Sequence, residues 1–90
     1  MTEQLGSHDR DTVRKLFEHP TSENIEWRQV KSLLESVGTA SEEADGALKV
    51  TVGGETELFH RPHGKDIDEQ MIVDLRRMLT RAGIGPESRS

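Results

Sequence analysis

The spacing of the hydrophobic residues changes from a helical one to a strand-like one in the middle of this chain and then back again. This change limits what the chain can fold into. Apolar residues recur every three or four positions in residues 13–37 and again in residues 71–82, which is the spacing of amphipathic helices. Between these stretches Leu48, Val50 and Val52 alternate with polar residues, as in a half-buried strand. Because helices and strands do not alternate one by one, the pattern predicts an α+β fold.

The periodicity and the capping residues predict three helices, over residues 9–18, 26–37 and 68–82. Asp9 or Asp11 is the expected N-cap of the first helix, and Asp66 or Asp68 that of the third. A carboxylate at this position accepts a hydrogen bond from a free backbone N–H of the first turn. Each candidate therefore marks the start of a helix.

Glycines mark where the second and third helices end. Gly38 is expected to form a left-handed C-terminal cap, and Gly83 is expected to end the last helix. Residues 1–8 show no period and are predicted to be a flexible N-terminus, and residues 85–90 a flexible tail. Residues 9–84 are then one domain.

The central part predicts a three-stranded antiparallel sheet, with strands over residues 39–44, 47–52 and 56–61. Asp45-Gly46 and Gly53-Gly54 supply the two tight turns, giving the order α-α-β-β-β-α with helices packed on one face of the sheet. A two-residue second turn would place Phe59 inward, and a three-residue turn Leu58. We expect Leu58 inward. The expected core is Trp27, Val30, Leu33, Leu34, Val50, Leu58, Leu75 and Leu79.

Composition excludes several classes of function. The absence of cysteine excludes disulfides, thiolate zinc sites and thiol catalysis, and no apolar run is long enough for a membrane span, so a cytoplasmic protein is expected. The net charge is −5, but residues 1–59 carry 6 basic and 12 acidic side chains, whereas residues 60–90 carry 6 and 5. A phosphate-binding surface is therefore expected nearer the C-terminal end.

The segment between the last strand and the last helix has the densest polar cluster, with His60, Arg61, His63 and Lys65. Cations beside a helix start suit an anion or phosphate, although a solvated connector before a capped helix explains the same residues. The two histidines are candidate general acids or bases. No third His or Cys lies near them, so neither a metal nor a cofactor is expected.

Three arginines, Arg76, Arg77 and Arg81, occupy one quadrant of the last predicted helix. They are candidate RNA-binding residues together with Arg61 and Lys65, or else a solvated helix face.

Several blocks of the sequence together resemble the HicA family of toxin–antitoxin proteins, in particular a longer subgroup with an extra N-terminal helix. They occur in the family's order at Leu16–Pro20, Asn24–Arg28, Leu33–Gly38, Phe59–Asp66 and Leu75–Ile84. The resemblance implies a fold like that of double-stranded-RNA-binding domains, a metal-independent mRNA endoribonuclease activity and a HicB-like antitoxin as partner.

One position departs from the family pattern. HicA toxins typically have Gly-Ser-His at the start of the second strand, and the matching residues here are Gly46-Ala47-Leu48. Either the chemistry has moved to His60 or His63, with His60 expected directly opposite Leu48, or the protein binds RNA or a partner without cutting. A noncatalytic protein-interaction module on the same scaffold, with an acidic surface for a basic partner, remains the alternative.

Overall fold

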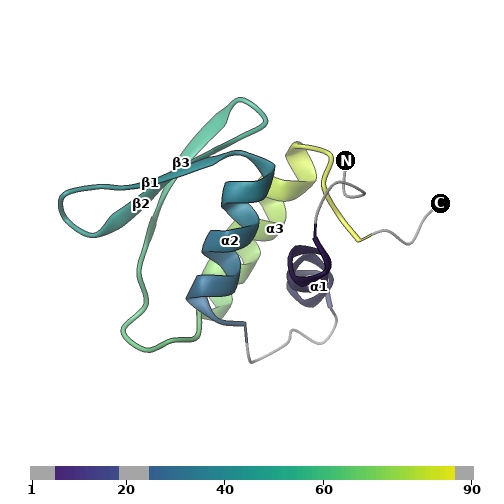
Figure 1. The fold of residues 1–90 in the computed structure, drawn as a ribbon, viewed down its shortest axis with the longest axis horizontal. Helices are drawn as coiled ribbons and strands as arrows, with labels where there is room; N and C mark the ends of the chain where they lie inside the picture. Colours follow the sequence, from purple (N-terminus) through teal and green to yellow (C-terminus); the bar gives the residue numbers. More distant parts are fainter. Residues whose placement is uncertain (1–5, 19–24, 87–90) are drawn as a thin grey trace.

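The computed structural model describes residues 6–18 and 25–86 and has the predicted α+β class (Figure 1). Three helices and three strands follow one another as α1 (Ser7–Leu16), α2 (Trp27–Val37), β1 (Thr39–Glu42), β2 (Ala47–Val52), β3 (Glu55–His60) and α3 (Glu69–Arg81). The strands form one antiparallel sheet in the order β1-β2-β3. No helix in the described part of the chain is both long and apolar enough to cross a membrane.

The helices and the sheet enclose an apolar core. Leu48, Val50 and Val52 are buried on the inner face of β2, because alternate side chains of a strand point to the same side. They pack with Leu33 of α2 and Leu75 of α3 in this core. In Figure 1, α1 lies on the side of α2 and α3 away from the sheet, and it packs against both helices.

The register of β3 corrects the expectation for Leu58. The turn between β2 and β3 has two residues, Gly53 and Gly54, both with positive φ, and it places Phe59 opposite Leu48. Phe59 is therefore buried, whereas Leu58 is 57% exposed. Two consecutive left-handed glycines close a tight hairpin without an extra residue, and this register buries the larger aromatic side chain.

The start of α1 also differs from the prediction. Gly6 is the N-cap and Ser7 the first helical residue, so residues 7 and 8 are helical and neither Asp9 nor Asp11 caps the helix. The Asp9 carboxylate is buried against α2 instead, where Ser32 and Ser36 donate hydrogen bonds to it. Residues 1–5 and 87–90, which fall in the expected flexible ends, lie outside the described residues.

The two glycines expected to end helices behave differently. Gly83 has φ +80°, and beyond it the N–H of Ile84 donates to the carbonyl of Leu79 at 2.9 Å, which closes the end of α3 as expected. Gly38 has an extended φ of −165°, so it is not a left-handed cap. At the other end of α3, Asp68 is the N-cap and its carboxylate accepts from the backbone N–H of Met71.

Candidate functional site

The connector between β3 and α3, residues 61–68, has a path fixed by backbone hydrogen bonds to the start of α2. The N–H of Trp27 donates to the carbonyl of Lys65 at 2.7 Å, and the N–H of Ile67 donates to the carbonyl of Ile25 at 2.9 Å. Ile25 and Ile67 are both buried, which anchors this short bridge in the core. The bridge brings the polar residues of the connector beside the first turns of α2.

The carboxylate of Glu26 lies between two cations, Arg28 of α2 and Lys65 of the connector. It accepts a hydrogen bond from Nε of Arg28 at 2.9 Å and lies 3.5 Å from Nζ of Lys65. The hydrogen bond from Arg28 is the main cause of a lowered pKa of Glu26, and the charge of Lys65 acts in the same direction. The Arg28 and Lys65 side chains are 86% and 76% exposed, so both can reach a ligand in solution.

Glu42 holds a second group of charges at the end of β1. Its carboxylate accepts from Nζ of Lys31 at 3.0 Å, and this hydrogen bond is the main cause of the lowered pKa of Glu42. The positive charge of Arg61 lowers the same pKa further, so Arg61 lies within electrostatic range of this carboxylate. Glu42 thus pairs with Lys31 of α2, and the charge of Arg61 acts on its pKa as a smaller effect.

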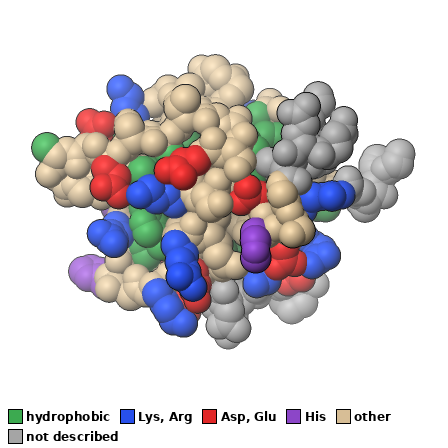
Figure 2. Space-filling view, in the orientation of Figure 1, with side chains coloured by type: hydrophobic (Ala, Val, Ile, Leu, Met, Phe, Trp, Pro, Cys, Tyr) green, Lys and Arg blue, Asp and Glu red, His purple; other side chains and the backbone are tan. Residues whose placement is uncertain are grey.

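These contacts define a surface that we call the basic face. Figure 2 shows Lys and Arg side chains gathered at the lower left of the view, over α2 and the connector. Four cations and the carboxylates of Glu26 and Glu42 carry two positive charges in excess, and Asp66, which pairs with Glu26 in the bridge, reduces this excess to one, whereas the chain as a whole carries −5. The basic face consists of Arg28, Lys31, Arg61 and Lys65, with Glu26 and Glu42 among them.

The three arginines predicted on α3 do not extend the basic face as one ridge. Nε of Arg76 donates to the backbone carbonyl of Leu16 at 2.9 Å, which fastens the end of α1 to α3. Arg81 pairs with Glu55 of β3 at 3.2 Å. Arg77 is exposed on α3. Arg76 and Arg81 therefore point to different neighbours, and of the predicted cations it is Lys65 that lies beside α2, where it pairs with Glu26.

His60 and Leu48, the residue at the position of the histidine in HicA toxins, lie on opposite faces of the sheet. His60 pairs with Ala47 and is exposed on the outer face of the sheet, away from the helices, and His63 is exposed in the connector. Leu48 is fully buried on the inner face. The expectation that His60 stands opposite Leu48 was wrong, because it depended on the three-residue turn.

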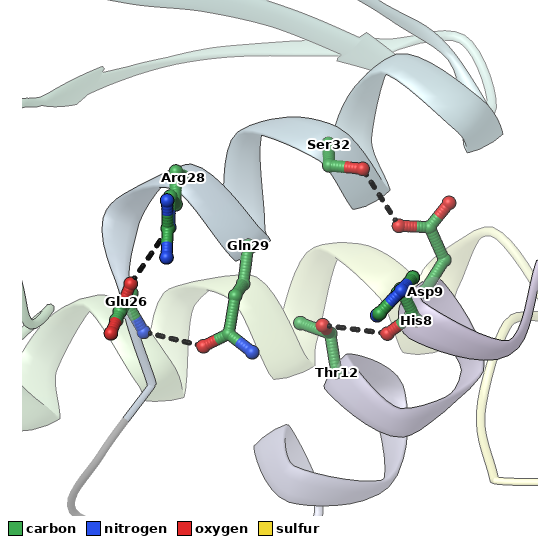
Figure 3. Close-up of a pocket in the computed structure, with 7 residues that line it drawn as sticks. All are labelled: His8, Asp9, Thr12, Glu26, Arg28, Gln29 and Ser32. Carbon is green, nitrogen blue, oxygen red and sulfur yellow. Dashed lines mark hydrogen bonds and ion pairs between the residues drawn. The ribbon is translucent and has the colours of Figure 1, made fainter.

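A pocket of about 450 Å³ lies between α1 and α2 (Figure 3). Its polar groups bond to one another: the hydroxyl of Ser32 donates to Asp9, that of Thr12 donates to the carbonyl of His8, and the side-chain oxygen of Gln29 accepts from the backbone N–H of Glu26. No buried side-chain N or O atom of the described residues lacks a partner. Of these bonds, the one from Ser32 to Asp9 joins α2 to α1, together with the bond from Ser36 to the same carboxylate.

No group of three or more His, Cys, Asp or Glu residues in the described ranges could hold a metal ion. No protein-family model matches the chain, and neither does any curated protein or solved structure compared with it.

Sequence analysis missed two members of the basic face. Arg28 and Lys31 are three residues apart on α2, a spacing that places them on the same side of a helix. That spacing was visible in the sequence. The bridge that brings the connector beside them was not, because it is formed by two single backbone hydrogen bonds between irregular segments.

Proposed function

We propose that this protein binds RNA through the basic face and that it is a HicA-like protein whose ribonuclease activity is weak or absent. The observation that carries the proposal is that Arg28 of α2 and Lys65 of the connector meet at Glu26 on the surface of an acidic protein, with Lys31 at Glu42 and Arg61 in the same connector. The element order from α2 to α3 is also that of the double-stranded-RNA-binding-domain fold implied by the resemblance. A HicB-like antitoxin is then the expected protein partner.

The charges of the basic face suit phosphate groups. Exposed ion pairs contribute only about 0–1 kcal/mol each, so little is lost when Arg28 or Lys65 leaves Glu26 for a phosphate. Each phosphate that is neutralised releases counterions from the nucleic acid, which makes binding favourable and dependent on salt. The long side chains of Arg and Lys can follow the backbone without fixing one RNA sequence.

The weak activity follows from Leu48. At this position the family histidine would act on the RNA, but leucine has no group that can transfer a proton, and here it is fully buried in the core. His60 and His63 are exposed and remain the candidate catalytic residues if any cleavage occurs. His60 is turned to the outer face of the sheet, so it cannot simply replace a side chain at position 48.

The proposal is tested with the double variant Arg61→Ala/Lys65→Ala. Measured by fluorescence anisotropy between 50 and 200 mM salt, wild-type affinity for a labelled RNA should fall steeply, and the variant should lose about two units of the slope of log K against log[salt]. The labelled RNA should remain largely intact.

The matched control is Arg14→Ala/Lys49→Ala, which removes the same charge from α1 and from the outer face of the sheet. It should keep the wild-type slope. Equal losses in the two double variants, or an affinity independent of salt, would contradict the proposal. Rapid cleavage of the RNA by protein free of host nuclease, surviving both His60→Ala and His63→Ala, would contradict the assignment of weak activity.

A second variant should improve binding. Glu42→Gln removes a carboxylate that pairs with Lys31 and lies near Arg61. A unit charge within a few ångströms contributes up to about 1 kcal/mol in water, so we expect RNA affinity to rise by about 2- to 5-fold. Asp11→Asn on α1 changes the net charge equally and should have less effect. If the two variants tighten binding equally, total charge rather than the basic face controls the affinity.

A protein-interaction module is the second candidate, and one observation favours it. Leu58 is 57% exposed on the outer face of the sheet, beside Lys49 of β2. An exposed apolar side chain contributes favourable free energy when a partner protein covers it and removes it from water. If this is the function, Leu58→Asp should abolish partner binding and leave RNA affinity unchanged.

A further inference from the structure

β3 forms one edge of the sheet, because the order is β1-β2-β3 and, within the described residues, β3 pairs only with β2. In a hairpin closed by a two-residue turn, the residues that flank the turn, Val52 and Glu55, form a hydrogen-bonded pair, and the pairs alternate from there. The backbone N–H and C=O groups of Thr56, Leu58 and His60 therefore point away from β2. This edge presents a row of backbone donors and acceptors to another strand.

The last helix lies over β2 where it passes this end of the sheet. A Cβ atom on Gly53, the residue after β2, would lie 2.9 Å from Cβ of Ala82 at the end of α3. Arg81 reaches from there to Glu55 at the start of β3. On the outer face, Leu58 is 57% exposed, more than any other large hydrophobic residue of the described ranges. The outer side of β3 is therefore open to a partner.

The charges along β3 and the residue after it change sign. Glu55 and Glu57 lie in the first part of the strand, and Arg61 follows its last residue. Glu57 pairs with Val50, so its side chain is on the inner side of the sheet. Arg61 lies four residues further, and because it precedes Pro62 it favours an extended backbone that keeps it on the same side. Antiparallel pairing of two copies would put the acidic part of each strand beside the basic end of the other.

Charge also distinguishes the possible registers. A two-fold axis between two copies of β3 requires that residues on the same side of the sheet face each other. One such register places the two Glu57 residues opposite each other, and the next places Glu57 opposite Phe59. The third places Glu57 opposite Arg61 of the other copy and Leu58 opposite His60. Directly opposite ions of unlike charge are stabilising and those of like charge are destabilising, so charge favours the third register.

We propose that the chain forms a two-fold symmetric dimer through antiparallel pairing of β3 with β3 of a second copy, in the register that places Glu57 of each copy opposite Arg61 of the other. Two three-stranded sheets then become one sheet of six strands, with the helices of both copies on the same side. The axis passes beside Phe59, and each ion pair occurs twice. Because only one pair of strands is in contact, the interface is small and the Kd should be roughly between 10 µM and 1 mM.

The test is sedimentation equilibrium of the full chain without RNA, over concentrations from about 5 µM to 1 mM. The wild type should be a monomer at the lowest concentration and largely a dimer at the highest. Glu57→Arg and Arg61→Glu each place like charges across the axis twice, and each should raise the Kd by about 10-fold or more. The double variant Glu57→Arg/Arg61→Glu restores both ion pairs with their signs exchanged, so its Kd should return to within about 3-fold of wild type.

The matched control is Glu35→Arg, which changes the net charge as Glu57→Arg does but lies on the exposed side of α2. Its Kd should stay within about 3-fold of wild type, because surface substitutions away from an interface have small effects. Circular dichroism of each variant checks that a loss of dimer is not a loss of fold.

A second measurement tests the register. The chain contains no cysteine, so introduced thiols are the only ones present. Leu58→Cys mixed with His60→Cys places two thiols directly opposite each other, with Cα atoms about 5.5 Å apart, a distance that a disulfide spans. The mixture should cross-link faster under mild oxidation than either variant alone.

Three results would overturn the inference. The first is a wild-type chain that stays monomeric at about 1 mM. The second is a dimer that Glu57→Arg and Arg61→Glu leave unchanged, or that the folded double variant does not restore. The third is Leu58→Cys cross-linking alone as fast as the mixture, which would mean another register. Since no RNA is present, all three leave the proposed function standing.

Discussion

Trp27→Ala is expected to lower the free energy of unfolding by about 3–5 kcal/mol, as truncation of a large aromatic in a core does. Trp27 is 9% exposed and packs in the core at the first residue of α2. A small domain has only about 5–15 kcal/mol of stability in total, so the variant should be partly or wholly unfolded at physiological temperature. Thermal unfolding should be followed by circular dichroism, because Trp27 is the single tryptophan of the chain.

Leu58→Ala is the matched control for this variant. Leu58 is a large apolar residue, but its side chain is 57% exposed, so its truncation should change stability by no more than about 0.5 kcal/mol. If Trp27→Ala melted like wild type while Leu58→Ala was strongly destabilised, the packed face of the protein would be wrongly assigned. Urea titrations of both variants with equal m-values would exclude a change in the unfolded state as the cause.

Gly38→Ala is expected to have the second large effect. A Cβ atom at this position would lie 2.0 Å from the backbone carbonyl oxygen of Thr51, far inside van der Waals contact. The backbone of β2 cannot move away without breaking the ladder that pairs Thr39 with Thr51. We expect a loss of about 3 kcal/mol or more, at the upper end for overpacking, measured by thermal or urea unfolding.

Gly64→Ala in the connector provides the comparison. A Cβ there would meet no atom within 4 Å, and Gly64 does not have a positive φ. Its replacement should therefore be neutral or slightly stabilising, because alanine reduces the freedom of the unfolded chain. Equal stability of Gly38→Ala and Gly64→Ala would mean that α2 and β2 approach each other less closely than described.

The hydrophobic period was sufficient to predict the fold class. The stripe of Val30, Leu33 and Leu34 is a helical one and is buried as predicted, and the alternation of Leu48 and Val50 gave a strand whose inner face is fully buried. These patterns are strong because one face of each element must exclude water. The prediction therefore depended on local spacing, which the sequence contains.

The register of β3 could not be obtained in the same way. Leu58 and Phe59 are adjacent and both apolar, so the pattern of this strand allows either to face the core. The length of the turn decides between them, and it depends on Gly53 and Gly54 both adopting positive φ. The error carried over to the site, because it placed His60 on the wrong side of the sheet.

The candidate site was predicted in part, for a similar reason. Arg61 and Lys65 stood out because they lie in a short polar connector before a helix, which is a local feature. Arg28 and Lys31 join them only in three dimensions, through the bridge at Trp27. Arg76, by contrast, looked like a surface cation, but its side chain bonds to a backbone carbonyl of α1.

The bond between Arg76 and Leu16 has a consequence for synthesis on the ribosome. The two residues are 60 positions apart, and α1 is made well before the helix that carries Arg76. At about 5–20 residues per second, the end of α1 waits roughly 3–12 s before this partner is added to the chain. An isolated helix of this length is marginal in water. During that interval α1 lacks its contact with α3, whereas Ser32 and Ser36 of α2, which bond to Asp9 of α1, are already part of the chain.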